Sequence, residues 1–179
     1  MQKKLILILV LLSILTALMV FFAFLRVPFL GNLVSPYDSS KNPINIVFRY
    51  GYDYRNELNT FNGTFTKDLV IDGTATTRLI LSQEELNQIQ SKLSDIGFYD
   101  FPNIFPSTGV VTPRADYYLK VQNGSTVNEV TWYSDSFNDA NTGPQQVESD
   151  LNQLYSLITG MIEGKLEYKL LPTANGAYC

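Results

Sequence analysis

The chain has 179 residues, among them 13 lysines and arginines, 17 aspartates and glutamates, one cysteine and no histidine. Beyond residue 26, ten basic residues stand against seventeen acidic ones, and this net charge of −7 argues against nucleic acid as a partner. The lack of histidine excludes Ser-His-Asp and Cys-His nucleophiles and the usual zinc sites, and a single cysteine allows no disulfide within the chain. About 150 residues lie beyond the first apolar run, enough for one domain with a proper core.

An apolar run occupies residues 5–25 and is interrupted only by Ser13 and Thr16. Since each helical residue adds about 1.5 Å, the run spans roughly the 30 Å hydrocarbon core of a membrane. Two phenylalanines precede Ala23, so the small-residue pattern of a signal-peptide cleavage site is missing. The run therefore predicts an uncleaved membrane anchor, with a cleaved secretion signal as the alternative.

The charges around this run predict its orientation. Lys3 and Lys4 precede it, whereas only Arg26 follows it closely. Because positive charge is retained on the cytoplasmic side, we expect a single-pass protein with its amino terminus in the cytoplasm and its body outside the cell membrane. Residues 27–43 contain prolines and serines without periodicity and predict a linker.

The body of the chain begins with strand patterns. Residues 44–52 alternate apolar and polar side chains and predict a first strand, followed by a polar loop at 53–59. Residues 64–71 and 74–81 are rich in β-branched and apolar side chains, and the Asp-Gly pair between them predicts a two-residue hairpin turn.

A capped amphipathic helix is expected next. Ser82 and Glu85 form a capping box, and Gly97 supplies the left-handed residue that ends a helix. Between them, apolar residues recur at spacings of three, four and three: Leu86, Ile89, Leu93 and Ile96. One face of this helix is expected to pack on a sheet.

The second half repeats this plan. Residues 116–122 and 125–133 predict another hairpin around Asn123-Gly124. A second capping box, at Thr142 and Gln145, opens a second helix that ends near Gly164. Its apolar stripe consists of Val147, Leu151, Leu154, Ile158 and Met161.

The order strand, hairpin, helix, hairpin, helix predicts an α+β fold in two layers, a mostly antiparallel sheet of about five strands with two helices on one face. The predicted organisation has four parts: a membrane anchor at 1–26, a linker at 27–43, the α+β extracytoplasmic domain at 44–165 and an extended tail at 166–179.

One group of polar residues suggests acid-base chemistry. Lys67, Asp68 and Asp72 place an amine beside two carboxylates. Strand alternation, however, puts Lys67 with Phe65 on one face and Asp68 on the other, and the hairpin turn accounts for Asp72. A solvent-exposed charge pair or a structural bridge explains these residues better than an acid-base site.

A second group suggests a metal. Asp135, Asn138, Asp139 and Asn141 gather oxygen ligands before the second helix, as calcium requires. Phe137 stands where an EF-hand loop needs an acid or an amide, and Asx turns with helix capping explain the same residues without metal. We therefore predict no metal and no cofactor.

The aromatic residues supply the candidate ligand surface. Most of the many tyrosines and phenylalanines are expected in the core, but Tyr52, Tyr54 and Phe105 fall in predicted loops. Aromatic side chains concentrate at carbohydrate-binding and protein-binding surfaces, so these three are where we expect a ligand.

Several motifs carry a resemblance to a known group of proteins. They are Leu-Asn-Thr-Phe-Asn-Gly-Thr-Phe-Thr-Lys-Asp at 58–68, Leu-Ser-Gln-Glu-Glu at 81–85, the aromatic cluster at 98–102, and Glu-Tyr-Lys with Leu-Pro at 167–172. With these motifs, most of the chain beyond residue 50 resembles an uncharacterised prokaryotic family of secreted or membrane-anchored domains that has no assigned activity. That family often ends in Gly-Gly-Tyr, where this chain has Gly-Ala-Tyr. The resemblance implies an architecture and a location, and no catalytic residue.

The sequence thus favours a membrane-anchored extracytoplasmic domain that binds an unknown protein or envelope polymer without catalysing a reaction. An envelope hydrolase that pairs Asp100 with Asp53 or Glu57 is one alternative. A structural subunit of a membrane complex, held through residues 5–25, is another.

Overall fold

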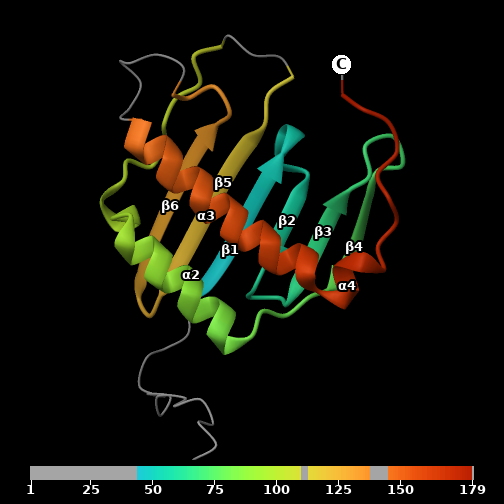
Figure 1. Ribbon diagram of the computed structural model, residues 1–179, viewed down its shortest axis with the longest axis horizontal. Helices are drawn as coiled ribbons and strands as arrows, with labels where there is room; N and C mark the ends of the chain where they lie inside the picture. The colour runs from blue at the N-terminus through green and yellow to red at the C-terminus, as the bar shows by residue number, and fades with distance from the viewer. Residues whose placement is uncertain (1–43, 110–112, 138–144, 179) are drawn as a thin grey trace, which may run out of the picture. The chain divides into compact units, whose positions relative to one another are not determined.

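A six-stranded antiparallel sheet with helices on one face forms the structure, a computed structural model that describes residues 44–109, 113–137 and 145–178 (Figure 1). These residues belong to the second of two compact units, Asn42–Cys179. The predicted anchor and linker, at 1–43, lie outside the described residues. Within the described part, no helix is both long enough and apolar enough to cross a membrane.

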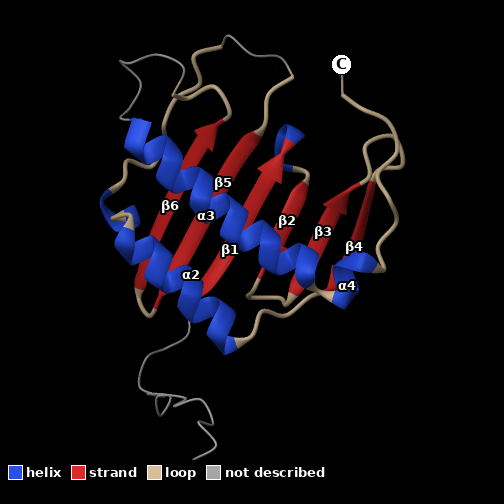
Figure 2. Cartoon of the chain, in the orientation of Figure 1, coloured by secondary structure: helices blue, strands red, loops and turns tan. Residues whose placement is uncertain are grey.

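The strands lie in the order β4-β3-β2-β1-β5-β6. They are β1 (Asn45–Gly51), β2 (Asn56–Asn59), β3 (Thr64–Asp68), β4 (Thr74–Arg78), β5 (Asp116–Asn123) and β6 (Thr126–Tyr133), and the helices are α2 (Gln83–Asp95), α3 (Gln145–Gly164) and α4 (Leu166–Lys169). Figure 2 shows α2 and α3 next to each other across one face of the sheet. The predicted two-layer α+β fold is confirmed, with six strands instead of about five.

β1 runs through the centre of the sheet and supplies the middle of the core. Ile46, Phe48 and Tyr50 alternate toward the helices and are buried, as the sequence pattern predicts. Phe48 lies opposite Leu58 of β2 on one side and Leu119 of β5 on the other, and all three are fully buried. This apolar row beneath the helices joins the two halves of the sheet.

β2 occupies the stretch where the sequence predicts a polar loop, and that prediction is wrong. The strand reads Asn-Glu-Leu-Asn, and only Leu58 is buried. One apolar side chain in four residues gives no alternation to recognise. The strand forms because β1 and β3 bond to it from both sides, which is a tertiary effect.

The predicted two-residue turn at 72–73 is also wrong. β3 and β4 pair Asp68 with Thr74, so the connection comprises the five residues 69–73. The Leu69 N–H donates to the Gly73 carbonyl over 2.8 Å, and the Leu69 side chain is buried. Val70 follows with a φ angle of 62°, which is outside the strand region, so the pairing ends earlier than the Asp-Gly pair alone predicts.

α2 begins and ends as predicted. The Ser82 Oγ accepts a hydrogen bond from the Glu85 N–H over 3.2 Å, and the Ser82 N–H donates to Glu85 Oε2 over 2.6 Å, which completes the capping box. Gly97 follows the helix with a φ angle of 67°. The predicted stripe faces the core, with Ile89 and Leu93 fully buried and Leu86 and Ile96 partly buried.

β5 and β6 form the second predicted hairpin, with one correction. Asn123 pairs with Thr126, so the turn residues are Gly124 and Ser125 rather than Asn123-Gly124. Gly124 has a φ angle of 60°, so the glycine takes the first of the two turn positions. The shift is by two residues in the pairing register, so the side chains keep their faces: Leu119, Val121, Val130 and Trp132 are buried.

α3 confirms the second predicted helix. Of its predicted stripe, Leu151, Leu154 and Ile158 are buried, and Val147 and Met161 pack partly buried against the core. The helix ends at Gly164 as expected. Thr142, the predicted capping residue, lies outside the described residues.

The prediction of an extended tail at 166–179 is correct only in part. α4 is a short helix at the start of this stretch, and its Tyr168 ring lies 5.6 Å from the ring of Phe65 in β3. That aromatic contact gives the first turn of the tail an apolar partner, so it folds as a helix. Hydrogen bonds of this helical turn reach Leu171, and the described tail beyond it has no further helix.

Candidate functional site

The connection between β1 and β2 holds two of the three residues other than glycine that have positive φ angles among the described residues; the third is Val70, at 62°. Asp53 and Tyr54 both have positive φ angles, 50° and 56°, within the short turn η1 (Tyr52–Tyr54). Such conformations cost a residue other than glycine about 1–3 kcal/mol each and cluster at functional sites. Two in succession persist only where neighbouring groups hold them, so the neighbours of η1 define the candidate site.

A carboxylate of β5 holds this turn from one side. The Asp53 N–H donates to Asp116 Oδ2 over 3.1 Å, and Arg114 Nε donates to the other oxygen, Oδ1, over 2.9 Å. Asp116 is buried, so the Arg114 guanidinium compensates a carboxylate that little water reaches. The ion pair therefore fixes the backbone of Asp53.

Arg114 also contacts Ser107 and Tyr133. Its Nη1 donates to Ser107 Oγ over 2.8 Å, and its guanidinium carbon lies 4.2 Å from the centre of the Tyr133 ring. The hydrogen bond and charge of Asp116 raise the pKa of Arg114, so the side chain stays cationic. A planar cation stacked on an aromatic ring is a common feature of recognition surfaces.

Tyr54 joins the same group. Burial, followed by a hydrogen bond with Tyr133, raises the pKa of the Tyr54 phenol well above its ordinary value. The phenol therefore stays protonated and serves as a hydrogen-bonding group, not as a base.

A second arginine, Arg55, directly follows η1 in the chain. Arg55 Nε is 3.4 Å from Asp68 Oδ1, and Asp68 is buried with 8% of its surface exposed. Tyr178, from the tail, stacks on Tyr52 with ring centres 4.0 Å apart. We call Tyr52, Tyr54, Arg55, Arg114 and Tyr133 the tyrosine–arginine surface.

The residues predicted as a ligand surface separate into two groups. Tyr52 and Tyr54 lie together on the tyrosine–arginine surface, and Tyr52 keeps 42% of its surface exposed. Phe105 is only 7% exposed, because its ring packs 5.7 Å from Phe101 and 5.3 Å from Phe137. Its placement on a ligand surface is therefore wrong: the loop that carries Phe105 turns inward and adds to the core.

The acid-base grouping on the first hairpin does not assemble. Lys67 lies on the helix side of β3, where its Nζ is 4.8 Å from the centre of the Tyr168 ring. Asp68 is on the opposite side and forms a structural bridge to Arg55. Asp72 is exposed in the loop beyond. The structure confirms the opposite faces and the structural bridge.

Asp135 has a structural explanation. Its Oδ2 accepts hydrogen bonds from Ser107 Oγ at 2.8 Å, from the Gly109 N–H at 2.9 Å and from Thr108 Oγ1 at 3.3 Å. Burial alone raises the pKa of this carboxyl, but the hydrogen bonds outweigh it and hold the pKa below its ordinary value of 3.8. Through these hydrogen bonds, the ionised Asp135, which follows β6, holds the loop before β5 in place.

The residues that were weighed as a calcium site, and judged not to be one, lie only partly within the described residues. Asn138, Asp139 and Asn141 lie outside the described residues. Among the residues that the structure describes, no three or more His, Cys, Asp or Glu side chains gather closely enough to hold a metal ion.

Of the three carboxylates considered for a hydrolase, Glu57 is paired with an arginine. Glu57 Oε2 lies 2.6 Å from Arg49 Nε on the sheet face away from the helices, and this ion pair is partly exposed. Asp53 lies in η1 beyond β1, whereas Asp100 lies in a 3-10 turn that follows α2. An ion-paired Glu57 is poorly suited to the acid or base role that glycoside hydrolysis requires.

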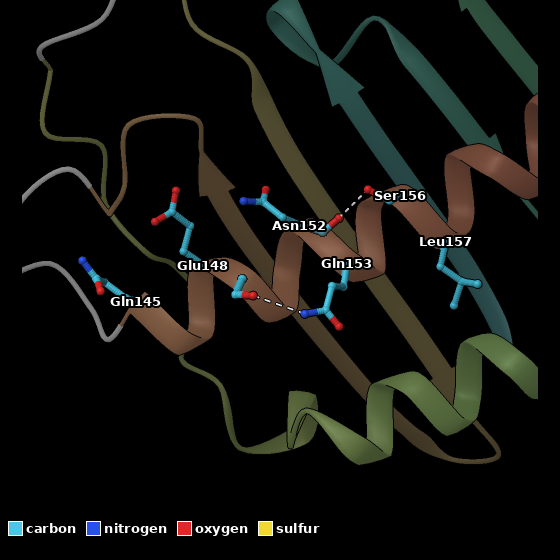
Figure 3. Close-up of a pocket in the computed structure, with 7 residues that line it drawn as sticks. Gln145, Glu148, Asn152, Gln153, Ser156 and Leu157 are labelled. Atoms are coloured by element: carbon cyan, nitrogen blue, oxygen red, sulfur yellow. Dashed lines mark hydrogen bonds between the residues drawn. The ribbon is translucent and has the colours of Figure 1, made fainter.

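A shallow hollow lies along the outer side of α3 (Figure 3). The described residues that line it all belong to that helix: Gln145, Glu148, Ser149, Asn152, Gln153, Ser156 and Leu157. Hydrogen bonds within the helix join Gln153 to Ser149 and the Ser156 hydroxyl to the Asn152 carbonyl. One carboxylate among amides and hydroxyls gives no catalytic grouping, and the tyrosine–arginine surface remains the stronger candidate.

Comparison with models of known protein families and with curated proteins gives no match to this chain. The resemblance drawn from the motifs therefore rests on those motifs alone, and function has to be argued from the geometry.

Sequence reasoning finds Tyr52 and Tyr54 but misses the residues that hold them. Arg55 follows the aromatic turn directly, and that adjacency was a usable signal. Arg114 and Asp116 come from a distant loop and strand, so no local pattern connects them to η1. Tyr178 likewise reaches Tyr52 only through the path of the tail.

Proposed function

We propose that this protein is a membrane-anchored extracytoplasmic interaction domain that binds a partner through the tyrosine–arginine surface and catalyses no reaction. The partner is a protein or an envelope polymer. The anchor and the outside location rest on the apolar run at 5–25 and the charges that flank it.

One observation carries the proposal. Strained backbone in η1 presents an exposed tyrosine, and the two arginines of the surface are each held by a buried carboxylate. Tyrosine and arginine are the residue types that dominate binding energy at protein interfaces. Because the arginines are already fixed, little side-chain entropy is lost when a partner docks.

The pairing of charges supports binding over catalysis. Asp68 and Asp116 each neutralise an arginine, and Glu57 neutralises Arg49. Catalytic carboxylates commonly show environments that drive their pKa values apart, and these ion pairs instead keep each carboxylate occupied.

The test compares two equally exposed aromatic residues at opposite ends of the strands. The full chain, in mild detergent, is immobilised and exposed to envelope extract, and retained components are identified by mass spectrometry. Tyr52→Ser is expected to reduce retention of the partner at least tenfold, because Tyr52 lies on the tyrosine–arginine surface. Phe61→Ser, which changes a residue 45% exposed in the β2–β3 connection, is the matched control.

An equal loss of partner retention in both variants would indicate that the fold is damaged or that exposed aromatic residues adhere non-specifically, and it would count against the tyrosine–arginine surface. Retention unchanged by Tyr52→Ser, or no component retained by a folded wild-type chain, would overturn the proposed function.

A further inference from the structure

The end of the tail pairs with the β3–β4 connection through a single β-bridge. The Asn175 N–H donates to the Leu69 carbonyl over 3.1 Å, and the Ile71 N–H donates to the Asn175 carbonyl over 3.2 Å. Asn175 thereby forms a parallel bridge with Val70. Figure 1 shows the tail passing this connection before the chain ends. Main-chain bonds of this kind are how folded domains commonly capture extended peptides.

The next residue fits without a side chain. Gly176 has a φ angle of 90°, and a Cβ built on it would lie 2.6 Å from Ile71 Cδ1. Any other residue would have to adopt an unfavourable backbone conformation and also shift the exposed Ile71 side chain. The backbone conformation therefore favours glycine at this position of the bound segment.

Tyr178 then contacts a polar socket, formed by Tyr52, Arg55 and Asp68. Its hydroxyl donates to Asp68 Oδ2 over 2.7 Å and accepts from Arg55 Nη1 over 2.6 Å. Its ring stacks on Tyr52, with 17° between the ring planes. Bonds to charged groups are the stronger class of hydrogen bond, and two of them with a stacked ring select tyrosine at this position.

The stretch between α4 and this segment is held weakly. Pro172, Thr173 and Ala174 are exposed, and Lys67 Nζ donates a hydrogen bond to the Pro172 carbonyl over 3.0 Å. Segments with few buried contacts open at low free-energy cost. The tail thus has the form of a peptide ligand on an exposed tether.

We propose that Tyr52, Arg55, Asp68 and residues 69–71 form a peptide-binding site for an extended Asn-Gly-x-Tyr segment, filled in cis by the tail of the same chain and able to accept the same segment from a second copy. A second copy is the occupant because it carries the identical segment. Exchange of tails would make a reciprocal dimer without any new contact surface. The inference goes beyond the proposed function, since it requires no envelope partner.

Binding in trans tests the site. A fluorescent peptide with the sequence of residues 169–178 is titrated into the full chain carrying Tyr178→Ala, and fluorescence anisotropy is measured. We expect saturable binding, at least tenfold weaker to the wild-type chain because its own tail competes at high effective concentration. A peptide carrying Gly176→Val is expected to bind at least tenfold weaker, about 1.4 kcal/mol.

A peptide that binds both chains equally, or a Gly176→Val peptide that binds as well as the original, would contradict the site. If Tyr178→Ala prevents folding, as judged by circular dichroism, the chain carrying Gly176→Val takes its place. Arg55→Met, added to either chain, is expected to abolish the saturable binding, and undiminished binding would count against the socket.

Exchange between copies is measured separately. Two full chains with different affinity tags are mixed in detergent, warmed and purified through one tag. The second chain is expected to be retained, and at least tenfold less when both copies carry Gly176→Val. No retention of the wild-type partner, or equal retention with Gly176→Val, overturns exchange even where the peptide binds. Because purified chain alone is used, these outcomes are independent of the envelope-capture experiment.

Discussion

Asp135 shows how much a single buried carboxylate can organise. No part of the residue is exposed, yet its charge is stabilised by the hydroxyls of Ser107 and Thr108 and by the Gly109 N–H. In the sequence, Asp135 was one of four residues weighed as a calcium site and explained instead by Asx turns and helix capping. Its role follows from the approach of two loops that lie far apart along the chain.

Asp135→Asn should lower the free energy of unfolding by about 2 kcal/mol at pH 7, because hydrogen bonds to a charged group are each worth about 1.5–3 kcal/mol. The folded-state pKa of Asp135 lies below its ordinary value of 3.8. The carboxylate therefore contributes full stability above that value, and its contribution is lost as the pH falls further, through the folded pKa. Urea denaturation from pH 7 down to pH 3 should show that the difference in free energy of unfolding between wild type and variant narrows toward pH 3.

Asp72→Asn provides the control, since Asp72 is exposed in the β3–β4 connection. If the difference in free energy of unfolding between wild type and Asp135→Asn stays constant over the whole pH range, the charge of Asp135 is not what stabilises the loops.

At the scale of elements, the sequence predicted an element reliably where several local signals for it, such as a cap, an apolar stripe and a terminating glycine, lie within one short stretch. The Ser82–Glu85 capping box, the apolar stripe of α2 and Gly97 all lie within one short stretch, and the helix follows them closely. β2 had no such signal. Its single inward residue, Leu58, is buried because strands from elsewhere bring it under the helices.

Ser82→Ala is expected to lower the free energy of unfolding by about 1 kcal/mol, because it removes the acceptor of the Glu85 N–H at the start of α2. Ser94→Ala is the matched change near the other end of the same helix, where the hydroxyl donates to the Gln90 carbonyl within the helix and is exposed. Thermal unfolding followed by circular dichroism should show a clear loss for Ser82→Ala and a change within about 0.5 kcal/mol for Ser94→Ala. Equal effects would mean that the cap contributes nothing specific.

At the scale of the whole molecule, β2 is the seam of the sheet. It is the strand that connects the β3–β4 hairpin to β1, and it does so with only four residues. Leu58 lies between Phe48 of β1 and Phe65 of β3 in the pairing register, and all three are fully buried. The seam therefore depends on one apolar side chain that bridges two aromatic residues.

Leu58→Ala should lower the free energy of unfolding by about 2–5 kcal/mol, because it leaves a cavity at a site packed on both sides. Hydrogen exchange is expected to quicken in β5 as well as in β3, since a cooperative sheet loses stability as one unit. Val127→Ala, at a position 47% exposed in β6, should change stability by no more than about 0.5 kcal/mol. Faster exchange confined to β3 and β4 would show instead that the hairpin unfolds independently of the rest.

The sequence by itself determined the α+β class, the inward faces of β1, β5, α2 and α3, and the helix start at Ser82, because each depends on residues that are neighbours along the chain. The structure alone decided the existence of β2, the turn positions of both hairpins, the burial of Phe105 and the meeting of η1 with Arg114, Asp116 and Tyr178. Each of these depends on contacts between distant segments, and side-chain periodicity carries no information about which distant segments meet.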